Sequence, residues 1–369
     1  MKIFYDFYEI AFDKGKSIGI YNYAISLLNA LALNNEDVEF VVACSDEHKF
    51  DLPVNYNVYF KIVSPKYPTL KQRILWRYHE AIKTAESVNA DIYFTPKGFS
   101  PGIAKRVSKP FIVVTIHDMI PFYYLEKHPD YFGFFQNLVI TRTLLQSISI
   151  ANGTITVSNF SKEKILKYYK KDTDINVVYN GVSVLENKVN ADNRTPYIFA
   201  ITSNLPHKNK NNLINGYLAY AQKANNPLPL KICGINKNDV DINIGSDDNI
   251  SFIKYANPNE FKDLFSNAIA FVFVPEIEGF GFPPLEALLY NIPSVVSDIP
   301  VLREVLAESA VFVDPYDTEN IGHGIQTLLA DSAVYDRIIS SKDSTISKYT
   351  WEKCARQTMN VFKKLISGS

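Results

Sequence analysis

Residues 270–290 decide the fold, and they read AFVFVPEIEGFGFPPLEALLY. The run begins with five apolar residues, Ala270–Val274, whose β-branched and aromatic side chains are typical of a buried strand. Two glycines and two prolines follow within residues 279–284. They predict a turn and then a helix that begins near Pro284. A buried strand, a tight turn and a helix make the repeating unit of a parallel sheet.

The same pattern recurs along the chain. Further buried strands are predicted at 38–43, 91–95, 111–116, 153–157, 175–178, 197–202, 230–233 and 294–297. Helices are predicted at 20–33, 70–88, 134–150, 162–169, 211–223, 258–267, 284–290 and 351–366. Near-continuous apolar strands that alternate with helices predict an α/β protein with parallel sheets covered on both faces.

The chain is long enough for two domains. It has 369 residues, and one domain takes roughly 100–200. A polar stretch at 182–196, rich in Asn, Asp and Lys, separates the two blocks of alternation and is interpreted as a linker. We therefore predict a first Rossmann-like domain over 1–183, a second over 184–349 and a terminal helix over 350–369.

Composition excludes several classes of protein. The 38 basic and 39 acidic residues give a net charge of −1, whereas a general nucleic-acid binder is usually basic. Three widely spaced cysteines, Cys44, Cys233 and Cys354, argue against a disulfide framework or a zinc site and fit a reducing cytoplasm. The N-terminus does not read as a signal peptide, and no apolar run approaches the ~18 residues of a spanning helix. We expect a cytoplasmic protein.

Ligands of open parallel sheets bind beyond the carboxyl ends of the strands. Three segments at such strand ends contain charged or titratable side chains that could bind a ligand. His117 follows one predicted strand, Lys208 another, and Glu278 and Glu286 bracket the turn quoted above. A lysine suits a phosphate, the start of a helix favours an anion, and carboxylates accept hydrogen bonds from sugar hydroxyls. Gly279 and Gly281 are expected to adopt positive φ and let a ligand approach the backbone. Gly15 and Gly19 frame a loop that is expected to open the helix at Ile20.

Each of these features also has an ordinary structural interpretation, which the residues alone leave open. Glu286 can cap a helix in its first turn while Glu278 is solvated. Lys208 lies in a segment that is simply polar, and a histidine after an apolar strand is often a satisfied structural residue. A glycine-containing loop before a helix is weak by itself as a sign of ligand binding.

The segment Glu278–Glu286, EGFGFPPLE, resembles the signature of retaining GT-B glycosyltransferases, specifically glycosyltransferase family four. Five other segments match the family in the expected order: Thr115–Asp118, Val157–Ser161, Val178–Val182, Pro206–Lys210 and Tyr349–Glu352. The resemblance implies two Rossmann-like domains that face a cleft, the first for the acceptor and the second for a nucleotide sugar. It also implies a last helix that crosses back to the first domain.

The resemblance assigns roles to particular residues. Glu278 contacts the transferred sugar, Glu286 holds the ribose hydroxyls, Lys208 binds the diphosphate, and His117 lies near the reacting sugar. The full donor-binding set it implies is Asn204, His207, Lys208, Tyr255, Glu278, Gly279, Phe280, Gly281, Phe282 and Glu286. The acceptor-binding set is Gly19, Tyr21, His117 and Asp118. The chain departs from the family where two arginines are common, because it has Ser203-Asn204 and His207 there.

The resemblance further implies a metal-independent reaction without a cofactor, in which Lys208 and helix dipoles neutralise the leaving diphosphate. No carboxylate is an evident nucleophile, which favours attack on the face that the leaving group occupies. The sequence most resembles mannosyl- and rhamnosyltransferases of bacterial O-antigen and capsule synthesis, so GDP-mannose is the expected donor and a lipid-linked glycan the expected acceptor. Two alternatives stay open: a sugar-nucleotide epimerase, and a degenerate transferase retained as a non-catalytic partner.

A lipid-linked acceptor implies peripheral contact with the inner face of the membrane. Basic and aromatic residues gather near the start of the helix predicted at 70–88, namely Lys66, Tyr67, Lys71, Arg73, Trp76, Arg77 and Tyr78. Such residues favour an anionic bilayer surface. We expect the buried stripe of this helix to consist of Leu70, Ile74, Leu75, Tyr78 and Ile82. An ordinary solvated helix face is the alternative interpretation.

Overall fold

Two parallel sheets organise the computed structural model, which describes residues 1–10, 18–99, 102, 109–170, 173–183, 196–242 and 249–368. The chain divides into two units, one of Met1–Gly181 with Tyr349–Ser369 and one of Val182–Lys348. Every strand pair in both sheets is parallel, so the predicted α/β class is confirmed. Gly15 and most of the predicted linker, residues 184–195, lie outside the described residues.

The sheet of the first unit has the strand order β3-β2-β1-β4-β5-β6-β7. Its strands are β1 (Lys2–Asp6), β2 (Glu39–Ser45), β3 (Val58–Ser64), β4 (Ile92–Thr95), β5 (Phe111–Ile116), β6 (Gly153–Thr156) and β7 (Ile175–Val177). Its helices are α1 (Ile18–Asn34), α2 (Leu70–Leu75), α3 (Ala81–Ser87), α4 (Ile120–Lys127), α5 (Phe134–Ile150), α6 (Asn159–Tyr168) and α14 (Trp351–Ser367), with a 3-10 turn η1 (Lys49–Asp51) and a π-helical turn η2 (Trp76–Glu80).

The sheet of the second unit has the order β10-β9-β8-β11-β12-β13. Its strands are β8 (Ile198–Ile201), β9 (Leu230–Cys233), β10 (Ile250–Ile253), β11 (Ala270–Phe273), β12 (Ser294–Ser297) and β13 (Val311–Val313). Its helices are α7 (Lys210–Lys223), α8 (Pro258–Asn267), α9 (Phe282–Leu289), α10 (Pro300–Leu306), α11 (Thr318–Ala330), α12 (Ser332–Ser340) and α13 (Lys342–Ile346), with 3-10 turns η4 (Pro206–Lys208) and η5 (Lys237–Asp239).

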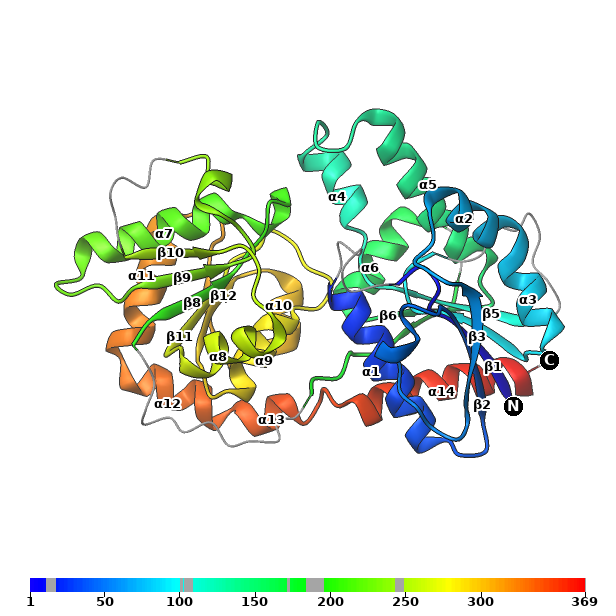
Figure 1. Ribbon diagram of the computed structural model, residues 1–369. Coiled ribbons are helices and arrows are strands. Elements are labelled where there is room, and N and C mark those ends of the chain that lie inside the picture. The colour runs from blue at the N-terminus through cyan, green and yellow to red at the C-terminus, as the bar shows by residue number, and fades with distance from the viewer. Residues whose placement is uncertain are drawn as a thin grey trace. The chain divides into compact units, whose positions relative to one another are not determined.

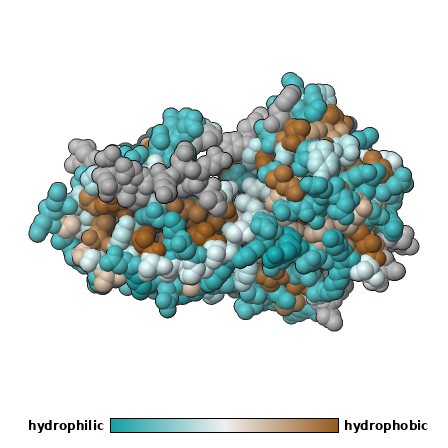
Figure 2. All heavy atoms as spheres, turned by 90° about the horizontal axis from the view of Figure 1, so that it is seen from below, coloured by the Kyte–Doolittle hydropathy of each residue, from teal (hydrophilic) through white to brown (hydrophobic). Residues whose placement is uncertain are grey.

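Side chains of β1 alternate between two layers of core, as the two-residue period of a strand requires. Ile3 and Tyr5 pack with α1 and α14 on one face, whereas Phe4 packs with Trp76 and α3 on the other. Figure 1 draws the last helix in red beside the first helix in blue, although they stand at opposite ends of the sequence. The outer surface is mostly polar on the face in Figure 2, with hydrophobic residues in separate patches.

Four strands escape sequence-based prediction: β1, β3, β10 and β13. β1 carries a charged residue at each end, Lys2 and Asp6, so its apolar run is only three residues long. β3 and β10 are edge strands with several exposed or half-buried positions, and β13 has three residues. Short or half-exposed strands give little apolar signal, because fewer of their side chains face a core.

The helix predicted over 70–88 is wrong in its continuity and in its buried face. A π-helical turn, η2, separates α2 from α3 and changes which side chains face the sheet. Trp76 is buried there and its Nε1 donates to the carboxylate of Asp6. Of the predicted stripe only Ile82 is buried, whereas Leu70, Ile74, Leu75 and Tyr78 are exposed.

α1 begins at Ile18, two residues earlier than predicted. Gly19 therefore lies within the first turn of the helix and not in a loop before it. A Cβ added at Gly19 would meet nothing within 4 Å, so close packing does not explain the glycine.

Gly181 is where α14 joins the first unit, and it leaves no room for a side chain. A Cβ there would lie 2.3 Å from the backbone N of Trp351 and 2.6 Å from its Cα. Gly181→Ala should force the start of α14 away and reduce stability by about 1–3 kcal/mol, the usual effect of overpacking. Urea unfolding measures this change.

Gly19→Ala is the matched control, because its added methyl meets open space and alanine favours a helix. Its stability should be unchanged or slightly higher. An unaltered unfolding midpoint for Gly181→Ala would contradict the close packing described at Trp351.

Candidate active site

The order of strands in the second unit reverses between β8 and β11, which pair directly. The loops that leave the carboxyl ends of two such strands turn to opposite sides, so a ligand can enter between them. The loop after β8 contains η4 and Lys208, and the loop after β11 contains Glu278. A backbone hydrogen bond of 2.8 Å from Glu276 N to His207 O joins the two loops.

Lys208 and Glu278 meet at this edge of the sheet. The Nζ of Lys208 donates to Oε1 of Glu278 in a direct ion pair, and the same ammonium lies 5.5 Å from the ring centroid of Phe273. Both side chains are partly exposed, 24% for Lys208 and 13% for Glu278. The two residues stand 70 positions apart in the sequence, and only the pairing of β8 with β11 brings them together.

The side chain of Asn209 fixes the backbone next to Lys208. Its backbone is left-handed, with φ of 58°, a conformation that asparagine tolerates better than most residues. Its Nδ2 donates to Val274 O at 2.9 Å and to Pro315 O at 2.7 Å. The hydroxyl of Thr202 also donates to Lys208 O at 3.1 Å. The backbone that carries the lysine is therefore tied to two neighbouring strand ends.

The helix that follows Glu278 starts at Phe282, with Pro283 and Pro284 in its first turn. Gly281 is its N-cap with φ of 95°, as predicted, and a Cβ there would lie 2.5 Å from Leu302. The prediction for Gly279 is wrong, because its φ is not positive. The rings of Phe280 and Phe282 pack edge to face at 5.3 Å, and Phe280 is buried.

Glu286 lies in the second turn of α9 and not in the first turn as predicted, so it does not cap the helix. It forms no ion pair with any residue that the structure describes. Burial raises the pKa of its carboxyl from 4.5 to about 7. Between pH 4.5 and pH 7 the carboxyl of Glu286 is largely protonated in the folded chain and largely ionised in the unfolded chain. The group therefore makes the fold less stable as the pH rises through this range.

The remaining predicted donor residues are spread more widely. His207 is buried beside Lys208. Asn204 is exposed, and its Oδ1 accepts from Lys210 Nζ at 3.3 Å. Tyr255 is also exposed and follows the edge strand β10, two strands from β8. The structure therefore gathers Lys208, His207, Glu278 and the start of α9 at one edge, with Tyr255 at a distance.

His117 in the first unit lies just beyond the end of β5, and Ser161 Oγ donates to its backbone oxygen at 3.0 Å. Its Nε2 lies 2.7 Å from Pro96 O. A carbonyl oxygen only accepts, so Nε2 carries the hydrogen and Nδ1 of the neutral ring is left as an acceptor. Burial lowers the pKa of His117 to about 4. The imidazole is therefore uncharged near neutral pH, and it packs edge to face on the ring of Tyr23.

The other predicted acceptor residues have structural contacts of their own. Asp118 accepts from the backbone N of Ile120 at 2.9 Å, which fixes the entry to α4. Tyr21 lies on α1 with its ring 6.1 Å from that of Phe7. Among the described residues no group of three or more His, Cys, Asp or Glu side chains is placed to hold a metal ion.

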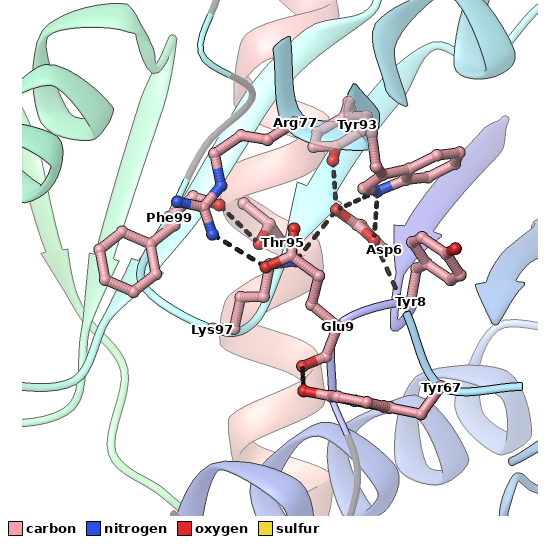
Figure 3. Close-up of polar contacts among 10 residues, drawn as sticks. Asp6, Tyr8, Glu9, Tyr67, Arg77, Tyr93, Thr95, Lys97 and Phe99 are labelled. Carbon is pink, nitrogen blue, oxygen red and sulfur yellow. Dashed lines mark hydrogen bonds and ion pairs between the residues drawn. The ribbon is translucent and has the colours of Figure 1, made fainter. Parts of the chain in front are cut away.

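One cluster was missed by sequence reasoning. Asp6, Glu9, Arg77 and Lys97 meet at the carboxyl ends of β1 and β4 (Figure 3). From the sequence, Asp6, Glu9 and Lys97 receive no role, and Arg77 is expected at a bilayer surface. Had β1 been predicted as a strand, Asp6 and Glu9 would have stood at a strand end, where ligand-binding residues gather.

Two family models match the chain, and between them they cover most of it. Residues 19–184 match the model described as Glycosyltransferase Family 4, and residues 183–344 match the model described as Glycosyl transferases group 1. The boundary between the two matches falls beside the boundary between the two structural units.

Two named relatives and one solved structure are also similar to this chain. The O-antigen chain mannosyltransferase RfbU of Salmonella typhimurium is 30% identical over 255 residues, which are 67% of this chain and 68% of the relative. O-antigen chain mannosyltransferase B of Escherichia coli is 26% identical over 299 residues, 74% of each chain. The HepE protein of Anabaena, solved in complex with UDP-glucose, has a TM-score of 0.69 at 15% identity and 100% coverage of both chains, which shows a shared fold. By these matches the chain belongs to glycosyltransferase family 4.

Proposed function

We propose that this protein transfers a hexose from a nucleotide sugar, with GDP-mannose as the first candidate, to a lipid-linked glycan in bacterial surface polysaccharide synthesis. The names of the two mannosyltransferase relatives support the sugar and the pathway. The observation that carries the proposal is the pairing of Lys208 with Glu278 at the switch point of the second sheet. A cation for a diphosphate and a carboxylate for sugar hydroxyls lie there side by side.

In this proposal the bound donor breaks the ion pair between Lys208 and Glu278 and gives each of the two side chains a new partner. Its diphosphate takes Lys208 away from Glu278, because a diphosphate carries more negative charge than a carboxylate. The freed carboxylate then accepts hydrogen bonds from the hexose hydroxyls, so Glu278 is not left buried and unpaired. Recognition of the diphosphate and of the sugar would thus be coupled through one ion pair.

Transfer is proposed to proceed with retention and without a metal. Lys208 and the amino end of α9 would stabilise the negative charge that develops on the leaving diphosphate. Same-face attack would let the leaving phosphate oxygen take the proton of the acceptor hydroxyl. His117, which the family resemblance assigns to the reacting sugar, would act as a neutral hydrogen-bonding group, because its pKa of about 4 leaves it uncharged.

Lys208→Ala should lower turnover at saturating donor by on the order of 10²–10³-fold, the scale of losing one charge-stabilising group from a transition state. Initial rates of hexose transfer from the nucleotide sugar measure it. Lys208→Arg keeps the charge and should retain more activity than the alanine variant.

Lys223→Ala is the matched control. This lysine of α7 pairs with the exposed Glu319 at 2.5 Å and has no place in the proposed chemistry. Full activity of Lys208→Ala would remove that lysine from the mechanism, and strong inhibition of the wild type by EDTA would contradict a metal-free reaction. An epimerised nucleotide sugar formed without any acceptor would favour an epimerase instead.

Donor affinity should rise with pH through the titration of Glu286. Ribose hydroxyls donate to the ionised carboxylate, which is about one tenth populated at pH 6 and about nine tenths at pH 8 when the pKa is about 7. The affinity for the nucleotide sugar should therefore increase on the order of tenfold between these values. Calorimetric titration at the two pH values measures this change. Glu286→Gln should bind more weakly at pH 8 and show a flat profile, and an unchanged pH dependence in that variant would refute the assignment.

We also propose that α2 touches an anionic bilayer surface. No helix among the described residues is long and apolar enough to span a bilayer. The side chains of α2 that were expected to be buried are instead exposed, with exposed fractions of 64% for Leu70 and 51% for Ile74. Lys66 and Lys71 are exposed near them. Arg77 does not belong to this surface, because it pairs with the buried Glu9.

Changing Leu70, Ile74, Lys66 and Lys71 together to Ser should abolish co-sedimentation with vesicles that contain phosphatidylserine. Each lysine near an anionic leaflet contributes about 1 kcal/mol, and the apolar side chains add their burial. High salt should weaken binding of the wild type. Leu33→Ser with Lys363→Ser removes exposed apolar and basic groups from other helices and should leave binding intact. Equal pelleting of wild type and the fourfold variant would exclude α2 as the contact.

A further inference from the structure

β3 is the outer strand of the first sheet and pairs only with β2 among the described strands. Phe40 N donates to Asn57 O at 2.9 Å, so Asn57 and every second residue after it turn their backbone groups towards β2. Successive residues of a strand turn these groups to opposite sides. The N–H and C=O of Phe60 and Ile62 therefore point away from β2, where the structure describes no further strand.

Large apolar side chains are exposed along this edge. Tyr59 and Ile62 in β3 are 52% and 39% exposed, and Val54 and Tyr56 just before the strand are exposed as well. An exposed edge of this kind is a site at which another strand can pair. Natural sheets often carry a lysine there to prevent pairing, and Lys61 is the one charged residue of β3. The residue that Lys61 would face in a partner therefore decides whether this edge can pair.

A groove follows the same edge, on the face of the sheet that carries η2 and α3. It is open to solvent, has a volume of about 350 Å³, and is lined by Lys61, Ile62, Val63, Trp76, Glu80, Lys83, Thr84 and Ser87. Val63 packs with the core cluster of Trp76 on this face, whereas Val58 and Phe60 pack on the other face. Because side chains alternate along a strand, Tyr59 lies on the groove face.

We propose that two copies of this chain pair through β3 about a two-fold axis that passes beside Phe60, perpendicular to the sheet. Such an axis makes the two strands antiparallel and keeps each side chain on its own face of the sheet. Phe60 then lies opposite Phe60 of the second copy, Tyr59 opposite Lys61, and Val58 opposite Ile62. This inference is independent of the proposed transfer reaction.

The backbone groups that point outward match in this arrangement. The N–H of each Phe60 donates to the C=O of the other, because both residues turn these groups away from β2. The N–H of each Ile62 reaches the C=O of Val58 in the second copy. Val58 N already donates to Asn55 O at 3.0 Å, so no backbone hydrogen bond of the single chain has to break.

Charge and hydrogen bonding select this register over its neighbours. An axis at Lys61 would place two ammonium groups directly opposite each other, which destabilises a pair of strands. An axis at Ile62 would need the C=O of Ser64, which already accepts from Asp46 N at 2.9 Å. The axis at Phe60 places each ammonium opposite a tyrosine ring, whose face attracts a cation.

The groove gives the tyrosine of the second copy a place to bind. Tyr59 of one copy lies opposite Lys61 of the other, and Lys61 lines the groove. A volume of about 350 Å³ is ample for one aromatic ring. The phenol hydroxyl can donate to Glu80, which lines the same groove. A ring that is half exposed in the single chain thus becomes buried twice over, once in each symmetric half of the dimer.

The test is sedimentation equilibrium of the full chain over a range of concentrations. The wild type should form a dimer that dissociates on dilution. Tyr59→Lys should raise the dissociation constant at least about tenfold, because a second ammonium then lies opposite Lys61 in both halves of the interface. Thr84→Arg should weaken the dimer as well, because it fills the groove from α3 and leaves β3 unchanged. Thermal unfolding shows that each variant is folded.

A charge reversal tests the register itself. Adding Lys61→Glu to Tyr59→Lys should restore the dimer, because the new ammonium of each copy then faces the new carboxylate of the other. Tyr316→Lys is the matched control, since it makes the same change at an exposed tyrosine of the second unit. Its dissociation constant should equal that of the wild type.

Three results would overturn the inference. The first is a wild type that stays monomeric at every concentration, and the second is a dimer that a folded Tyr59→Lys variant leaves intact. The third is a dimer that Tyr59→Lys breaks and the double variant does not restore, which would refute the register at Phe60. Thr84→Arg decides the matter should Tyr59→Lys fail to fold, and an intact dimer in that variant would count against the interface.

Discussion

Direct pairing of strands that are distant in sequence is the constraint on which the rest of this protein depends. β8 pairs with β9 on one side and β11 on the other, and β1 pairs with β2 and β4. In both sheets the order reverses beside the first strand, so the loops on its two sides diverge at the carboxyl edge. Lys208 meets Glu278, and Lys97 meets Glu9, because of this one topological feature.

The two lysine–glutamate pairs differ in exposure and in the distance between their charged atoms. Lys208 and Glu278 are partly exposed and bind each other directly, so an incoming diphosphate can exchange with the carboxylate at modest cost. Lys97 and Glu9 are nearly buried and stay about 3.4 Å apart, so their hydrogen-bonding capacity remains unfilled. The first geometry suits a highly charged ligand, whereas the second is closed to a group the size of a water molecule.

Much of the second unit could be read from local patterns. The strands predicted at Leu230–Cys233 and Ser294–Ser297 have their observed bounds, because nearly all of their side chains are buried and each run contains adjacent or alternating apolar residues. In the first unit, local patterns predict the wrong buried face for the segment 70–88. Trp76 in the π-helical turn η2 is buried and donates to Asp6, whereas Leu70 and Ile74 on α2 are exposed. No periodicity rule anticipates a partner 70 residues away that selects which face of a helix is buried.

The amino-acid sequence by itself determined the α/β class, the alternation of buried strands with helices, and the identity of Lys208, Glu278 and Glu286 as candidate site residues, because each depends on local apolar runs and on glycines and prolines at a turn. Tertiary structure alone decided that Lys208 is paired with Glu278, that burial raises the pKa of Glu286 to about 7, and that Lys97 lies unsatisfied beside Glu9. These properties depend on distances and on exclusion of water, and both arise only when strands far apart in the chain are packed side by side.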